Sequence, residues 1–341
     1  MKTINQTLSL LLCLLLTVSV LSGCGGSPGA EGPSATEPAE GSAPDSGRTL
    51  SIVTTIFPEY DWVRQILGDQ AENVELTMLL DSGVDLHSYQ PTANDLLKIS
   101  DCDLFLYVGG ESDQWVEGAL AQVTNPDQTV INLLDVLGDR VKEEEIVDGM
   151  EAEEEEEEGE EETEFDEHVW LSLKNAEALC SAIADALAAL DPDHADAYSA
   201  NARAYTDQLA ALDAEYQAAV DAADKDTILF GDRFPFRYLA DDYGLNYYAA
   251  FAGCSAETEA SFETIVFLSD KVDELELSAI LTIEGTDHRI AETIRDNTSS
   301  GNQEILAMDS LQSTTGQDVR DGITYLDAMT DNLSVLKTAL R

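Results

Sequence analysis

Short apolar runs of strand length alternate with helix-like segments twice along this chain, and this alternation limits the fold more than any other feature. Eight such runs are present, at 50–57, 74–80, 104–108, 129–133, 227–230, 247–251, 279–283 and 305–308. Strands that alternate with helices form mostly parallel sheets covered by helices on their faces. The sequence therefore predicts an α/β protein with two lobes, each built on such a sheet.

One long helical pattern separates the two groups of strands. Pro192 opens it, and apolar residues then recur at steps of three and four over about seven turns. The stripe consists of Tyr198, Ala202, Tyr205, Leu209, Leu212, Tyr216 and Ala219. We expect an N-terminal lobe over 48–190, a connecting helix over 191–223 and a C-terminal lobe over 224–341.

The first 47 residues read as an export signal and an anchor. The apolar run at 8–20 is too short to cross a bilayer and fits a signal peptide over 1–23. Small residues before Cys24 resemble the lipobox of bacterial lipoproteins, which makes Cys24 the expected lipidation site; a plain signal peptide is the alternative. Residues 24–47 are rich in Gly, Ser and Pro and predict a flexible tether on the extracellular face of a bacterial membrane.

The charge is strongly negative, at −51, which excludes ordinary nucleic-acid binding and favours cations as ligands. It is densest over 143–167, where 17 of 25 residues are Asp or Glu. We expect this segment to be a disordered insertion in the N-terminal lobe. Beyond Cys13 and Cys24, the cysteines Cys102, Cys180 and Cys254 form no CxxC motif. Their pairing is open, and small buried apolar side chains are the simplest interpretation.

Two of the four histidines lie at positions that favour a ligand. His87 follows a predicted strand, where a parallel sheet presents its binding loops, and His168 follows Asp166 and Glu167. Taken alone, each is more often an ordinary surface histidine. Neither belongs to an HExxH motif, so the helical zinc-protease signature is missing. His194 and His288 are expected at the surface.

Four segments together resemble one family. They are HSYQPTANDLLKISDCDLFLYVGG with the following Glu111 and Trp115, then DEHVWLS, FRYLADDYGL and ILAMDSL. In these segments the chain resembles the metal-binding lipoproteins of zinc and manganese ABC importers, in the cluster with a rigid helical backbone between lobes. The resemblance covers most of the chain after residue 50, and its first two segments are the more specific.

The resemblance implies a set of metal ligands. His87 and His168 occupy the first two ligand positions, and Arg233 lies at the third. Asp309 occupies the remaining position, which takes a carboxylate. Arginine has no lone pair to offer a cation. Asp232 is weakly favoured as the ligand that replaces Arg233, and Glu284 is a second candidate. In the remaining alternative, the metal has three protein ligands and a water molecule. The alternative for Asp232 is that it pairs with Arg233 and touches no metal.

The resemblance also implies the function. It is extracellular capture of a divalent metal and its delivery to the permease and ATPase of an ABC importer, by a monomer that is not an enzyme. Two imidazoles with carboxylates suit zinc, and a carboxylate-richer set suits manganese. A binding lipoprotein that has lost its metal and a zinc hydrolase are the alternatives. The acidic segment is interpreted either as an antenna that concentrates cations or as a solubility segment.

Overall fold

The computed structural model describes residues 49–151, 164–255 and 259–341. The chain divides into two units, Met1–Gly47 and Arg48–Arg341, and all described residues belong to the second. The predicted signal peptide, the tether and Cys24 therefore lie outside the described residues, as do 152–163 of the acidic segment. Within the described part, no helix has the length and apolar character needed to cross a membrane.

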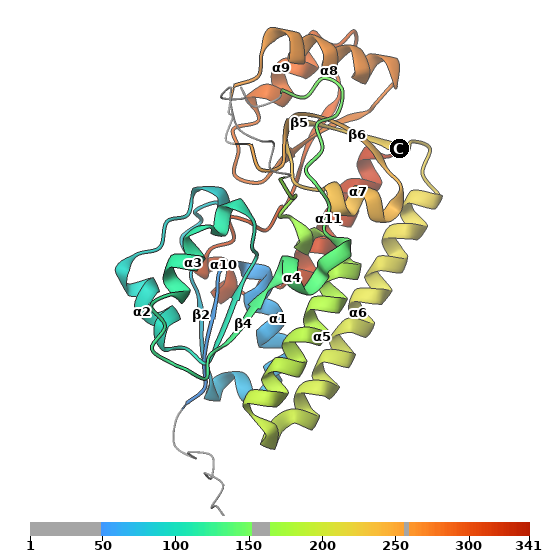
Figure 1. The fold of residues 1–341 in the computed structure, drawn as a ribbon. Helices are drawn as coiled ribbons and strands as arrows, with labels where there is room; N and C mark the ends of the chain where they lie inside the picture. The colour runs from blue at the N-terminus through green and yellow to red at the C-terminus, as the bar shows by residue number, and fades with distance from the viewer. Residues whose placement is uncertain (1–48, 152–163, 256–258) are drawn as a thin grey trace, which may run out of the picture. The chain divides into compact units, whose positions relative to one another are not determined.

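The N-terminal lobe contains a four-stranded parallel sheet in the order β2-β1-β3-β4 (Figure 1). Its strands are β1 (Ser51–Thr54), β2 (Glu75–Met78), β3 (Leu104–Tyr107) and β4 (Thr129–Asn132). Its helices are α1 (Phe57–Leu67), α2 (Ala93–Asp101), α3 (Trp115–Leu120) and α4 (Leu133–Leu137). The inner strand β3 is a continuous apolar run because helices cover both faces of a parallel sheet. Thr92 caps α2, where its hydroxyl accepts the Asp95 N–H.

The C-terminal lobe repeats this plan with a parallel sheet in the order β6-β5-β7-β8. Its strands are β5 (Thr227–Phe234), β6 (Asn246–Ala252), β7 (Ala279–Ile283) and β8 (Glu304–Met308). Its helices are α7 (Arg237–Tyr243), α8 (Phe262–Glu274) and α9 (Arg289–Asn297), and α10 (Gly316–Asp321) and α11 (Tyr325–Ala339) follow β8. The predicted two-lobe α/β fold is confirmed.

One long helix, the 27-residue α6 (Ala195–Asp221), joins the lobes, and α5 (Leu173–Leu190) packs beside it (Figure 1). A short turn, Pro192–His194, links the two helices. The predicted apolar stripe of α6 is buried at every position except Ala219, which is half-buried. The long connecting helix is thus confirmed.

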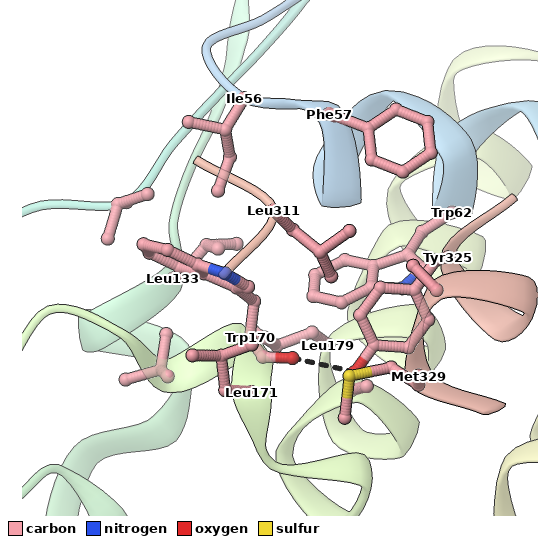
Figure 2. Close-up of a cluster of buried hydrophobic side chains, with 14 of the residues drawn as sticks. Ile56, Phe57, Trp62, Leu133, Trp170, Leu171, Leu179, Leu311, Tyr325 and Met329 are labelled. Atoms are coloured by element: carbon pink, nitrogen blue, oxygen red, sulfur yellow. Dashed lines mark hydrogen bonds between the residues drawn. The ribbon is translucent and has the colours of Figure 1, made fainter. Parts of the chain in front are cut away.

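One hydrophobic core runs through both lobes. It extends from Phe105 on β3 through Trp62 on α1 to Phe230 on β5. Figure 2 shows its centre, where Trp62 meets the edge of the Tyr325 ring at 5.2 Å and the Tyr325 hydroxyl donates to Trp170 O at 2.6 Å. Because α11 packs against α1 and α6, the end of the chain ties the two lobes together.

Two expectations from the sequence are wrong. The strand-like run at 50–57 is too long, because β1 ends at Thr54 and Pro58 already lies in the first turn of α1, where a missing N–H costs nothing. The acidic segment 143–167 is not disordered throughout. Glu143 bridges Phe165 in antiparallel fashion, Glu151 bridges Phe251, and Asp166 and Glu167 are buried. The expectation of disorder came from the count of acidic residues, which overlooked the apolar residues among them, such as Met150, which packs against the core.

The shared core predicts a large effect of Trp62→Ala. Removal of this fully buried ring should lower the free energy of unfolding by about 3–5 kcal/mol, because a cavity replaces its contacts. Phe262→Ala is the control, because this side chain is 77% exposed, and it should change the free energy of unfolding by less than about 0.5 kcal/mol. Equal effects in urea unfolding would contradict a core centred on Trp62.

Candidate metal centre

His87 and His168 meet although they are far apart in the sequence. Their Nε2 atoms lie 3.2 Å apart and their ring centroids 5.2 Å apart. His168 is fully buried, whereas the His87 side chain is 11% exposed. The pair therefore lies at a partly accessible point of the protein interior.

The same local turn positions both histidines. In Asp85-Leu86-His87 and Asp166-Glu167-His168, the aspartate accepts the backbone N–H of the histidine two residues later, at 3.0 and 2.9 Å. Such an Asx turn fixes the backbone where no regular element does. His87 lies in the 3₁₀ turn Leu86–Ser88, and His168 directly precedes the 3₁₀ turn Val169–Leu171. The repeated Asp-x-His spacing was visible in the sequence and was not used.

The outer ring nitrogens are held by polar neighbours. His168 Nδ1 lies 3.0 Å from Asp166 Oδ1, and His87 Nδ1 lies 2.7 Å from Ser112 Oγ and 3.6 Å from Glu167 Oε2. A ring whose Nδ1–H donates to such a partner presents the lone pair of Nε2 on its other side. Both lone pairs then point at the same space. Sequence analysis did not assign these roles to Asp166 and Ser112.

The neighbours also set the protonation of the pair. Burial, followed by the charge of His168, lowers the pKa of His87 to about 3. Burial pushes the pKa of His168 down as well, but the bonded Asp166 carboxylate and nearby Glu167 outweigh it, so this pKa is raised. The two shifts have opposite directions, so His168 rather than His87 is the ring that takes up a proton as the pH falls. That proton lies where a cation would bind.

The spacing of the pair fits a metal ion. Two zinc–nitrogen bonds at tetrahedral angles separate the nitrogens by about 3.3 Å, close to the spacing of the two Nε2 atoms. Among the described residues, His87, His168 and Cys254 form the one group of three or more His, Cys, Asp or Glu side chains that could hold a metal ion. Their ligand atoms lie within 4.8 Å of one another.

Cys254 was missed by the sequence analysis, which interpreted it as a small buried side chain. A signal was present, because Gly253-Cys254 directly follows the strand at 246–252, at the edge where parallel strands present ligands. The thiol is not paired in a disulfide. Burial and the nearby Asp166 and Glu144 carboxylates raise its pKa, so it is a neutral thiol without a cation.

Asp309 and Glu284 lie at the ends of β8 and β7, outside the three-membered group. Asp309 Oδ1 accepts the Leu311 N–H at 2.8 Å, and Glu284 accepts the N–H and hydroxyl of Ser310. Burial and the charge of Glu284 raise the pKa of Asp309 to about 6. Trp170 links this segment to the pair, because its Nε1 donates to Ser310 O and its ring centroid lies 5.2 Å from that of His168.

A bulge in β5 sends Asp232 and Arg233 in different directions. The register against β6 shifts between Phe230 and Arg233. The Asp232 carboxylate accepts the Thr286 hydroxyl at 3.0 Å and the Arg233 backbone N–H at 2.9 Å, and Asp232 is not in the three-membered group. The Arg233 guanidinium instead bonds Asp85 Oδ2 at 2.7 Å, across the two lobes.

Two cavities reach His87. One of about 230 Å³ is lined by His87, Cys254 and the acidic side chains of Glu111, Glu144, Glu164 and Glu167. The other, of about 370 Å³, is lined by His87, Asp85, Arg233, Asp232 and the segment 286–290. His288 lies there and bonds the Thr282 hydroxyl at 2.9 Å. Acidic groups thus surround the first opening to His87.

Comparisons with known proteins agree with this geometry. The family described as "Zinc-uptake complex component A periplasmic" matches residues 52–339. The zinc-binding lipoprotein AdcA of Streptococcus pneumoniae is 33% identical over 291 residues, which cover 84% of this chain and 55% of that protein. The high-affinity zinc uptake system protein ZnuA of Bacillus subtilis is 29% identical, over 88% of this chain and 91% of that protein.

The solved structures agree as well. The Zn(II)-bound ZnuA-like domain of Streptococcus pneumoniae AdcA superposes with a TM-score of 0.66 at 28% identity, over 86% of this chain and 99% of that one. This chain spans about 55% of the length of AdcA, its first curated relative. Since the family match covers nearly all of the two-lobe unit, the chain belongs to the zinc-uptake complex component A family.

Proposed function

We propose that this protein captures zinc outside the cell with high affinity and delivers it to the permease and ATPase of an ABC importer. The observation that carries the proposal is the facing pair of Nε2 atoms, 3.2 Å apart, with both outer nitrogens engaged by polar neighbours. The protein binds and releases its cargo and makes no covalent change in it. It works as a monomer.

The anchor belongs to the same proposal. Lipid on Cys24 and the tether over 24–47 would hold the two-lobe unit at the membrane that contains the permease. The relative from Streptococcus pneumoniae is named a zinc-binding lipoprotein, which supports this arrangement.

Zinc is the favoured cargo, with manganese second. Imidazole nitrogens suit zinc, and zinc binds more tightly than manganese in mixed nitrogen and oxygen sites. Asp309 is proposed as a carboxylate ligand. Its buried charge is opposed by Glu284, and a divalent cation would relieve that repulsion. The roles of Asp232 and Glu284 as ligands stay predictions.

The acidic segment is proposed to guide cations to the pair. Its flanking residues Glu144 and Glu164 line the cavity that opens onto His87. A cleft lined by one sign of charge raises the local concentration of the opposite ion, although salt screens the effect beyond about 8–10 Å. The interpretation as a solubility segment does not account for glutamates at the mouth of the site.

The pair predicts the effect of single substitutions. His87→Ala and His168→Ala should each lower zinc affinity by more than about 100-fold. Loss of a group that only orients a metal ligand already lowers affinity by about 10- to 100-fold, and loss of the ligand itself should have a larger effect. His194→Ala is the matched control, because His194 lies in the turn before α6 and bonds Asp191. Competition titration with a zinc chelator measures the effect. Full affinity in either site variant would contradict the proposal.

The protonation of the pair predicts a pH dependence. Zinc must displace the proton of His168, so affinity should fall as pH drops through the raised pKa of that ring, by up to about tenfold per pH unit. Because this pKa is raised, the loss should begin above about pH 6.5. Calorimetry in buffers of different ionisation enthalpy should find at least one proton released per zinc near neutral pH. Release of none would show that the site is already deprotonated.

A further inference from the structure

Cys254 is the third member of the group formed with His87 and His168. We propose that its sulfur is a ligand of the captured metal, so that the site of this chain contains two imidazoles and one thiolate. The inference rests on the proposed function, because it assumes that the metal binds between the two Nε2 atoms. It adds a cysteine that neither the resemblance nor the composition of the chain assigns to the site.

The distances allow sulfur coordination. Zinc bonds of about 2.3 Å to sulfur and 2.0–2.1 Å to nitrogen place these atoms about 3.6 Å apart at tetrahedral angles. Cys254 Sγ and one nitrogen of each histidine ring lie within 4.8 Å of one another. A shift of about 1 Å, within reach of a rotation about the cysteine side-chain bond, would bring the sulfur to such a distance.

The loop that carries Cys254 is fastened against the pair. A Cβ at Gly253 would lie 2.9 Å from His168 Cε1 and 2.9 Å from Phe234 O, so only glycine allows this approach. On the other side, the Cys254 N–H donates to Glu144 Oε1 at 3.1 Å. The loop is thus held between the imidazole and the flank of the acidic segment, which keeps Sγ near the ring nitrogens.

Arg233 leaves a ligand position in the C-terminal lobe unfilled. Its guanidinium bonds Asp85 Oδ2 and reaches Ser255 O at 3.4 Å, the residue after Cys254. An arginine has no lone pair for a cation, and its charge is neutralised here by Asp85. Arg233 therefore acts as a link between the lobes beside the site, and Cys254 supplies the donor.

One oxygen of Glu167 is buried near the outer nitrogen of His87. Glu167 is 1% exposed, and its Oε2 lies 3.6 Å from His87 Nδ1 and has no hydrogen-bond partner. Glu167 and Cys254 line the same cavity of about 230 Å³. A buried carboxylate oxygen without a hydrogen-bond partner is unfavourable, and positive charge at the neighbouring pair would offset this cost.

Sulfur coordination would change the choice of metal. As the metal–sulfur bond forms, the S–H bond breaks and its proton passes to solvent, which leaves the sulfur as a thiolate. Thiolate ligands favour zinc over manganese, whereas carboxylates favour the harder ion. The two imidazoles and Cys254 thus give this site a stronger preference for zinc than a carboxylate in the same position would give.

The test is spectroscopy of the full chain loaded with Co(II), together with zinc titration. The unaltered chain should show a sulfur-to-cobalt charge-transfer band in the near ultraviolet. Cys254→Ser should lose this band and bind zinc at least about tenfold more weakly. Cys254→Asp should recover part of the affinity without the band, because a carboxylate replaces the sulfur. Cys102→Ala is the control and should keep both properties, since Cys102 is buried beside Gln128 in the N-terminal lobe.

The outcomes separate the two proposals. If the unaltered chain binds no zinc, or if His87→Ala and His168→Ala leave binding intact, the proposed function fails. If zinc binds through the histidines, but Cys254→Ser keeps its affinity and the unaltered chain shows no charge-transfer band, then only the sulfur ligand is overturned. A melting temperature of Cys254→Ser equal to that of the unaltered chain excludes misfolding as the cause of weaker binding.

Discussion

The approach of the two imidazoles is the contact on which the site depends. Each ring is set by an Asp-x-His turn, and its outer nitrogen is engaged by Ser112 or Asp166, so that both inner lone pairs converge. The pKa of His168 is raised by Asp166 and Glu167, whereas burial and the charge of His168 lower the pKa of His87. In the proposed function, a metal ion would enter a prepared geometry, so little conformational entropy would be lost on binding.

The framework behind the pair restricts how the lobes move. The hydrophobic core is continuous from Phe105 to Phe230, and the last helix, α11, packs on α1. Both features oppose a wide separation of the two lobes. Near the site itself, the ion pair between Asp85 and Arg233 crosses from one lobe to the other. A movement that separates the lobes must break this pair and draw the Gly253-Cys254 loop away from His168. We infer that release of the cargo needs only such a local shift.

Most of the fold could be predicted from the sequence, because apolar periodicity is a local signal. The eight strands and the stripe of α6 follow from it. The flanks of the acidic segment were mispredicted because a charge count averages over the few apolar residues that pack. The meeting of His87 with His168 came from family resemblance, since spacing along the chain carries no information about it. Cys254 was overlooked for the same reason: its significance comes from neighbours that only the tertiary structure brings together.

The account depends most on where the metal binds. Crystals of the zinc-loaded protein, with anomalous diffraction collected on both sides of the zinc absorption edge, locate the ion directly. The account predicts one strong peak about 2.0–2.1 Å from Nε2 of both His87 and His168. A peak bound by the glutamates of the acidic cavity alone, with the two imidazoles still bonded to each other, would contradict it.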